Sequence, residues 1–379
     1  MSSGVSLGEI VRRIGPRYEQ SHRLTRPQRR ALRAISLCRT PALGGHLDQC
    51  NHCGFRHMVW HSCRNRHCPR CQAEARKQWL EERKRELLPV PYFHVVFTVP
   101  ELLNAFALGD PRRFYDILFA AVRETLLVIS SDRRRLGALI GVLAVLHTWG
   151  QPLTLHPHIH CVVPAGGFSL DGRRWLRARH KKFFLPRRVL ARYFRRRFLD
   201  LLREALRDDP AFRSRVEHAE DLLSRAARNE WVVFAKRPFG GPEQVLSYLA
   251  AYTHRIAISN RRIIGFDGDH VRFLYKDYRD GDRQKEMKLP ADEFLRRYLL
   301  HVLPERFVRI RYFGFLANRV RSENLELARH QLGTAPPQSA GSAELEQNAS
   351  APRCPCCQIG LMIIIEIVPP QLVEGIDSS

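Results

Sequence analysis

The sequence lacks any hydrophobic run long enough to cross a bilayer, which takes roughly 20 residues in a helix. Its two most apolar segments, residues 139–146 and Met362–Val368, are much shorter, and Glu366 interrupts the second. The first residues, MSSGVSLGEI, lack the basic stretch and apolar core of a secretion signal. We therefore expect a cytoplasmic protein without a membrane partner.

A nucleotide-binding pattern of the type GxxxxGK[ST] is also absent, so the sequence gives no sign of a built-in helicase or ATPase motor. With 379 residues, 44% of them hydrophobic, the chain has enough material for a buried core and for two or three domains. Ten cysteines in a chain of cytosolic character indicate metal ligands rather than disulfides.

Acidic residues are few relative to basic ones: 38 Asp and Glu stand against 62 Lys and Arg, a formal net charge of +24. The excess lies in residues 1–335, because residues 336–379 are acidic. Arginine greatly outnumbers lysine, and its planar guanidinium group matches phosphate oxygens well. Nucleic acid is the simplest polyanionic partner, although a GC-rich genome also produces arginine-rich proteins.

The order of apolar patterns and breakers predicts three segments. Residues 1–88 form a basic unit rich in Cys and His, residues 89–332 a catalytic domain, and residues 333–379 a linker with a short Cys-containing tail. We expect strands at 92–99, 139–149, 158–164, 231–236 and 307–311, and a hairpin at 261–266 and 270–276. We expect helices at 72–88, 113–129, 186–206 and 292–302, and one beginning near Gly240.

Two CxxC pairs lie in the first segment: Cys50 with Cys53, and Cys68 with Cys71, separated by 14 residues. This spacing is typical of four thiolates around one tetrahedral zinc ion, so we predict a structural zinc site. Nearby residues could replace a ligand or support a second ion, and the spacing does not decide between these alternatives; they are Cys63, His46, His52, His57, His61 and His67. Cys354 and Cys357 form a single further pair, either a zinc knuckle or a thiol-bearing turn.

His158 and His160 stand two apart in the expected strand 158–164. Side chains of a strand alternate between its faces, so both imidazoles point to one side and can bind a divalent cation together. The third ligand is open between His156, His147 and Gln151, and we favour His147. Imidazoles suit zinc or manganese, and phosphoryl chemistry also suits magnesium. The alternative is a group of structural histidines in an apolar strand.

Tyr248 and Tyr252 are four apart in an expected helix and would share a face. Such a pair usually serves packing. Beside a cation that polarises a phosphoryl oxygen, however, a tyrosine hydroxyl suits nucleophilic attack on a phosphodiester. Arg255 and Arg262, just beyond, are candidate phosphate-binding residues, unless they belong to a solvated basic face.

The segments HTWGQ at 147–151, HPHIHCVVPAGG at 156–167 and YLAAYTHRIAISN at 248–260 resemble the two-tyrosine HUH rolling-circle transposases of the insertion-sequence-ninety-one type. The amino-terminal zinc-binding region of that family is matched by CNHCG and SCRNRHCPRCQ. The resemblance implies an α+β fold, in which a small zinc-binding domain precedes an HUH endonuclease-like central antiparallel sheet flanked by helices. The His strand would lie in the middle of the sheet.

The resemblance also implies cleavage of single-stranded DNA by Tyr248 or Tyr252, leaving a 5′-phosphotyrosine and a free 3′-hydroxyl. The expected partners are single-stranded or hairpin ends of the protein's own mobile element, with host replication machinery, at the bacterial nucleoid. Two alternatives stay open at this point. One is an HUH nickase of plasmid replication or conjugation, and the other is a non-catalytic zinc-containing DNA-binding regulator.

Overall fold

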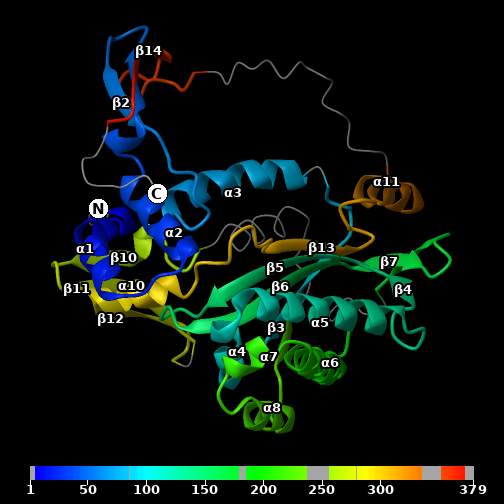
Figure 1. Cartoon of the computed structure of the whole chain (residues 1–379). Coiled ribbons are helices and arrows are strands. Elements are labelled where there is room, and N and C mark those ends of the chain that lie inside the picture. Colours follow the sequence, from blue (N-terminus) through cyan, green and yellow to red (C-terminus); the bar gives the residue numbers. More distant parts are fainter. Residues whose placement is uncertain are drawn as a thin grey trace. The chain divides into compact units, whose positions relative to one another are not determined.

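The computed structural model describes residues 5–84, 86–178, 185–236, 256–278, 280–334 and 351–371 (Figure 1). By packing, they form two units. The first comprises the described parts of Met1–Ala75, Ile258–Val302 and Gln338–Ser379, and the second those of Arg76–Ala257 and Leu303–Pro337. Each unit thus unites segments that are distant in the sequence. The linear division at residues 88 and 332 stays a prediction about function and does not describe this packing.

Two amphipathic helices, α1 (Leu7–Ser21) and α2 (Arg26–Leu37), open the first unit. α1 begins where the Ser6 hydroxyl accepts a hydrogen bond from Glu9 N at 3.3 Å, and α2 begins where Gln28 Oε1 accepts one from Thr25 N at 2.9 Å. The buried residues of α1 recur every three or four positions and form the stripe that packs on α2 and α10; they are Leu7, Ile10, Val11, Ile14 and Tyr18.

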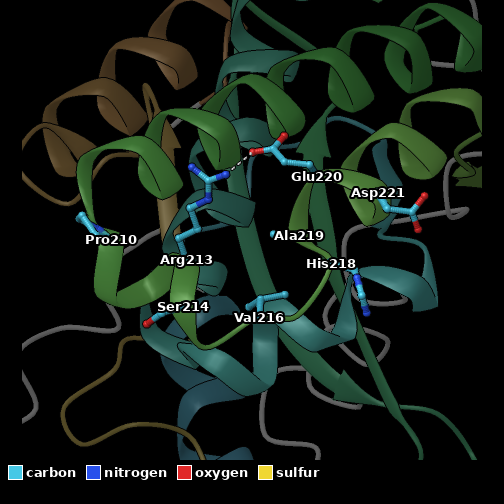
Figure 2. Close-up of a pocket in the computed structure, with 8 residues that line it drawn as sticks. All are labelled: Pro210, Arg213, Ser214, Val216, His218, Ala219, Glu220 and Asp221. Carbon is cyan, nitrogen blue, oxygen red and sulfur yellow. Dashed lines mark ion pairs between the residues drawn. The ribbon is translucent and has the colours of Figure 1, made fainter.

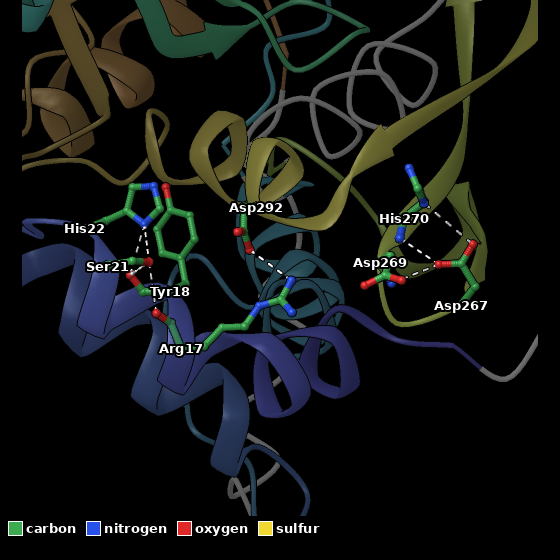
Figure 3. Close-up of polar contacts among 8 residues, drawn as sticks. All are labelled: Arg17, Tyr18, Ser21, His22, Asp267, Asp269, His270 and Asp292. Atoms are coloured by element: carbon green, nitrogen blue, oxygen red, sulfur yellow. Dashed lines mark hydrogen bonds and ion pairs between the residues drawn. The ribbon is translucent and has the colours of Figure 1, made fainter.

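An antiparallel sheet of β10 (Ile263–Phe266), β11 (His270–Asp277) and β12 (Arg283–Pro290) belongs to the same unit, with helix α10 (Ala291–Leu299). The predicted hairpin is confirmed, and β12 adds a strand that we did not predict. Figure 3 shows the turn between β10 and β11, where Asp267 Oδ1 accepts hydrogen bonds from the backbone N–H of Asp269 and His270 at 2.9 and 2.7 Å. Arg17 of α1 pairs with Asp292 of α10 at 3.4 Å.

The first unit also contains a small sheet in which strands from residues 45–60 pair with the last described strand of the chain. The hairpin β1 (Gly45–Cys50) and β2 (Arg56–Trp60) follows the short 3-10 turn η1 (Pro41–Leu43). On its other edge, β1 pairs antiparallel with β14 (Met362–Val368), with Gly45 opposite Val368 and Cys50 opposite Met362. The tail is thus a strand of an amino-terminal sheet.

A five-stranded antiparallel sheet, in the order β13-β5-β6-β3-β9, forms the centre of the second unit. Its strands are β3 (Tyr92–Thr98), β5 (Gly141–Trp149), β6 (Leu155–Pro164), β9 (Val233–Lys236) and β13 (Ile310–Gly314). β6, which carries His158 and His160, is the middle strand, as predicted. The predicted strands in this sheet are confirmed, with bounds shifted by a few residues.

One face of this sheet is covered by α5 (Pro111–Ser131) and α6 (Arg187–Asp208), with the short helices α4 (Asn104–Gly109), α7 (Pro210–Ser214) and α8 (Ala219–Arg228) beside them. Alternate residues of the strands point into this core: Ile159, Cys161 and Val163 of β6, and Val95 and Phe97 of β3. Phe194, Phe198 and Trp231 pack edge to face or tilted, with ring centroids 5.2 to 6.0 Å apart.

The other alternate residues of these strands, on the opposite face of the sheet, point into a second, smaller core. Tyr92, Leu143, Val145 and Val162 pack there with residues of α11 (Arg321–Gln331), and Trp79 and Leu80 of α3 (Pro69–Lys84) lie against it. A small sheet of β4 (Ala138–Leu139), β7 (Gly166–Ser169) and β8 (Trp175–Arg177) contributes Phe168. His94, His158 and His160 share this parity, so they lie on the sheet face opposite α5 and α6.

Within the described residues, no helix is both long and apolar enough to cross a membrane. The expected tyrosine helix near Gly240 lies outside the described residues.

Candidate metal centres

Three histidines converge at one end of the two central strands. His147 of β5 stands directly opposite His158 of β6 in the strand register, and His160 is the next residue on the same face. Their nearest ring nitrogens all lie within 4.8 Å of one another. The cross-strand pair and the two-residue step of β6 together therefore produce a three-nitrogen cluster. The structure brings His147 into this cluster, and His156 is not part of it.

Hydrogen bonds hold two of these rings through Nδ1. His158 Nδ1 lies 2.6 Å from the backbone oxygen of His156, so it carries a hydrogen and donates it. His160 Nδ1 lies 2.8 Å from Nε2 of His94 on β3. Both contacts direct Nε2 of His158 and His160 toward the cluster as the nitrogens that would bind a cation. Three imidazoles, two of them held through the second nitrogen, fit a divalent cation.

His94 is a site residue that we did not predict. It is 2% exposed, and its ring is stacked on that of His160 with centroids 5.1 Å apart. In the sequence it is a single histidine in the apolar strand YFHVVFTV, which resembles an ordinary buried residue. Only the order of the strands, in which β3 adjoins β6, brings it into contact with His160.

Eight of the ten cysteines form two further clusters, both in the first unit. One consists of Cys38, Cys63, Cys68 and Cys71, and the other of Cys50, Cys53, Cys354 and Cys357. The prediction that Cys50, Cys53, Cys68 and Cys71 surround one ion is therefore wrong in its grouping. Each CxxC pair takes its partners from elsewhere, because the β1–β2 hairpin separates the first pair from the second and β14 brings the tail to the first.

The sulfur atoms of the cluster around Cys38 lie close together. The Sγ–Sγ distance is 3.7 Å between Cys38 and Cys71, 3.6 Å between Cys63 and Cys71, and 3.6 Å between Cys38 and Cys68. Four sulfurs at about 2.3 Å from zinc would be about 3.8 Å apart. Hydrogen bonds with the neighbouring thiols, Cys63 foremost, lower the pKa of Cys38, and the same contacts with Cys38 raise the pKa of Cys63 and Cys68. Without an ion, the geometry therefore favours a thiolate at Cys38 alone. Cys38 ends α2, and Cys71 lies in the first turn of α3, so a metal here would connect these two helices.

The remaining predicted residues divide into two groups. Tyr248, Tyr252 and Arg255 lie outside the described residues. Arg262 lies at the end of the 3-10 turn η3 (Asn260–Arg262), and its Nε donates a hydrogen bond to Leu274 O at 2.7 Å while its guanidinium lies over Phe273. These contacts fix Arg262 on its own hairpin, and its binding to phosphate stays a prediction.

A surface hollow in the second unit lies around α7 and the start of α8 (Figure 2). Arg213 and Glu220 form an ion pair at 3.6 Å within it. The clustered histidines do not line it, so this hollow is no part of the candidate metal site.

Two family models match the chain. One, described as putative transposase, matches residues 141–324, which include β5, β6 and the histidine cluster. The other, described as transposase zinc-binding domain, matches residues 10–99, which include six of the eight clustered cysteines. The model thus covers Cys38, Cys50, Cys53, Cys63, Cys68 and Cys71, and a structural role for zinc follows from this domain and from the thiol clusters.

Relatives extend this similarity over the whole chain. The chain is 50% identical to "Putative transposase y4qJ" of Sinorhizobium fredii over an alignment 387 positions long, gaps included, which covers 96% of each protein. It is 29% identical to "Transposase for insertion sequence element IS801" of Pseudomonas savastanoi pv. phaseolicola over 313 residues, covering 79% of this chain and 73% of the relative. No solved structure matches. The family models and the relatives agree with the residues of the histidine and cysteine clusters. The chain therefore belongs to the two-tyrosine transposase family of the insertion-sequence-ninety-one type, with an amino-terminal zinc-binding domain.

Proposed function

We propose that this transposase cuts and rejoins single-stranded DNA through a covalent 5′-phosphotyrosine, in rolling-circle transposition of an insertion sequence. The observation that carries the proposal is the convergence of His147, His158 and His160 on one face of the central sheet. Three imidazoles held by strands form a rigid site, and rigid elements position reacting groups better than loops do.

The three imidazoles would hold a catalytic magnesium or manganese ion. When bound, such an ion polarises a phosphoryl oxygen and offsets the charge that develops there. The residues of the chain provide the positioning. His158 keeps its Nδ1–H on the His156 carbonyl, which leaves its Nε2 without a hydrogen. The Nε2 of His160 is likewise without a hydrogen when its Nδ1 donates to Nε2 of His94.

Tyr248 or Tyr252 would supply the nucleophile. The tyrosine oxygen, after losing its proton, attacks phosphorus and forms a new P–O bond. The bond between phosphorus and the 3′-oxygen breaks, and that oxygen leaves with the bonding electrons and takes up a proton as a 3′-hydroxyl. Rejoining reverses these steps, with a 3′-hydroxyl attacking the phosphotyrosine, so no ATP is needed. Two tyrosines would permit two sequential cleavages.

The proposed partner is DNA, in the form of single-stranded or hairpin ends of the protein's own element. The net charge of +24 favours a polyanion. Basic residues also line the outer side of α6, where Arg187, Arg188, Arg192 and Arg196 are exposed. Association with host replication machinery, action at the nucleoid of a bacterial cytoplasm, and phosphate binding by Arg255 and Arg262 belong to the same proposal.

The test is covalent capture. Labelled single strands carrying the ends of the flanking element are incubated with the full chain and Mn²⁺, and the products are denatured. A labelled adduct that resists denaturation is expected for the natural protein and for Tyr278→Phe, a control at an exposed tyrosine. Tyr248→Phe with Tyr252→Phe should abolish it.

Two outcomes would contradict the proposal. An adduct in the double Phe variant would place the nucleophile elsewhere, and no adduct from the natural protein on any single strand would favour a DNA-binding regulator. Cleavage of plasmid origin sequences in preference to element ends would favour an HUH nickase of replication or conjugation.

A further inference from the structure

The second cysteine cluster joins two segments of the first unit that lie far apart in the sequence. Cys50 and Cys53 lie at the end of the β1 strand and in the turn after it, whereas Cys354 and Cys357 lie just before β14. Cys50 and Cys357 are 307 positions apart in the sequence, yet their Sγ atoms lie 3.7 Å from each other. Cys53 and Cys354 are 301 apart, with the same Sγ separation of 3.7 Å. The transposase zinc-binding model ends at residue 99 and does not include the second pair.

The two CxxC segments have the same local structure. In the first, Gly54 N donates to Cys50 O at 3.2 Å, and the backbone N–H groups of His52 and Cys53 point to Cys50 Sγ, each at 3.4 Å. In the second, Gln358 N donates to Cys354 O at 2.9 Å. There the N–H of Cys356 points to Cys354 Sγ, and that of Gly360 to Cys357 Sγ, each at 3.4 Å.

The residue after each pair completes the match. Gly54 has φ of 73° and Gln358 has φ of 58°, both in the left-handed region that L side chains rarely adopt. These are two facing turns with N–H groups directed at sulfur, which favours thiolates over thiols.

The sulfur separations fit a metal rather than a covalent bond. A disulfide requires sulfurs about 2.05 Å apart. A tetrahedral zinc ion with bonds of about 2.3 Å requires about 3.8 Å between sulfurs. The cross-pairs at 3.7 Å match the second geometry, and all four cysteines are free.

The sheet around this cluster has almost no apolar core of its own. Its buried cluster consists of Cys50, Cys354 and Met362, with Cys357 packed against it. The isoleucines of β14 are largely exposed, from 47% at Ile363 to 77% at Ile367. Burial of side chains therefore contributes little to holding β14 on β1, and small units of this kind commonly rely on a metal.

Close backbone contacts show that the two segments are shaped for each other. Asn51 N donates to Leu361 O at 3.1 Å, and Asn51 Oδ1 accepts from Leu361 N at 2.8 Å. Gly360 lies so near that a Cβ atom there would meet Cys50 Sγ at 2.5 Å and Asn51 Oδ1 at 2.8 Å. Only glycine permits this approach.

We propose that Cys50, Cys53, Cys354 and Cys357 bind a second structural zinc ion, distinct from the one at Cys38, Cys63, Cys68 and Cys71, and that this ion fixes β14 on the amino-terminal hairpin. The carboxyl-terminal segment then completes the zinc-binding domain, although more than 200 residues of the catalytic part separate the two in the sequence. The proposal is independent of the DNA chemistry.

The first experiment measures zinc per chain by plasma mass spectrometry on the full protein purified in a thiol reductant. Cys354→Ser with Cys357→Ser should lower the zinc content by one ion per chain. Cys356→Ser is the matched control, because Cys356 lies between them and is outside the cluster. Cys38→Ser with Cys63→Ser should remove a different ion, so that combining both double variants removes two. An unchanged zinc content in the Cys354/Cys357 variant would overturn the proposal.

The second experiment measures amide hydrogen exchange in Met362–Val368, which does not depend on activity. In the natural protein these amides should be protected by pairing with β1. The Cys354/Cys357 variant should lose this protection, and the Cys356→Ser control should keep it. Protection retained without the ion, or a disulfide between Cys50 and Cys357 found by peptide mapping of the reductant-purified protein, would also overturn the proposal.

Discussion

His94 and His160 meet across neighbouring strands of the central sheet, with Nε2 of His94 2.8 Å from Nδ1 of His160. Both rings are buried and nearly parallel, with 7° between their planes. One of the two nitrogens must carry the hydrogen. If His160 binds a cation through Nε2, its own Nδ1 carries the hydrogen and His94 accepts it. His94 would then be a positioning residue for the catalytic site.

This relationship predicts the behaviour of His94 variants. His94→Leu removes the acceptor, so the ring of His160 loses its fixed orientation and tautomer. We expect the Mn²⁺ concentration needed for half-maximal adduct formation to rise by roughly 10- to 100-fold. His94→Gln retains an acceptor oxygen and should lie between His94→Leu and the natural protein.

The Mn²⁺ dependence of adduct formation distinguishes a positioning role of His94 from a purely structural one. A variant that only destabilised the sheet would lower the yield at every Mn²⁺ concentration, whereas loss of positioning moves the metal dependence and leaves the plateau largely unchanged. Identical Mn²⁺ dependence in His94→Leu and in the natural protein would contradict the assigned role.

The regrouped cysteines predict a specific effect at Cys38. In the grouping expected from the sequence, Cys38 was not a ligand and its substitution would be neutral. In the structure its Sγ lies 3.7 Å from that of Cys71. We expect Cys38→Ser to lower the zinc content and to make the end of α2 sensitive to limited proteolysis, with Cys356→Ser as control. Full zinc content and native protease resistance in Cys38→Ser would contradict this.

The charge of the chain predicts a steep salt dependence of DNA binding. A protein that neutralises several phosphates releases their counterions, so affinity for a single strand should fall by roughly 10³-fold or more between low and moderate salt. Fluorescence anisotropy with a labelled strand over a KCl series measures the slope. Charge reversal on the exposed side of α6, with Arg188→Glu and Arg192→Glu, should make the slope shallower. A nearly flat response in the natural protein would show that the net charge of +24 does not act on DNA.

The sequence predicts the central part of the site because the signal is local. The two-residue step from His158 to His160 places both rings on one face in any strand, and the apolar run before His147 predicts the strand next to it. The middle position of β6 also agrees with the expected fold. His94 was missed because its role depends on β3 being the other neighbour of β6, and strand order is not encoded in a single strand's pattern.

The cysteine grouping was wrong for a related reason. Two CxxC pairs 14 residues apart satisfy the spacing of a zinc site, so spacing favours the nearer pair as the partner of Cys50 and Cys53. The actual partner of Cys50 is 307 positions away and becomes adjacent only through the pairing of β14 with β1. Cys38 and Cys63 are single cysteines without a CxxC pattern, so spacing alone could not assign them.

The sequence left the third ligand of the proposed catalytic cation open between His147, which we favoured, His156 and Gln151. The structure places His147 opposite His158. The ring centroid of His147 lies 5.4 Å from that of His158 and 4.5 Å from that of His160. His156 contributes its backbone oxygen to His158 instead, a contact that does not require its side chain.

We therefore expect His147→Ala to lower adduct formation at limiting Mn²⁺ by about 10-fold or more, because the ion loses one of three nitrogen ligands. His156→Ala keeps the carbonyl that orients His158 and should retain most of the activity. Both variants remove an imidazole from the same end of the sheet, so each controls for the other. Calorimetric titration with Mn²⁺ should show weakened binding in His147→Ala alone. If His156→Ala were the more damaging in both measurements, the third ligand would be His156, and the cluster that the structure shows would differ from the one that acts on DNA.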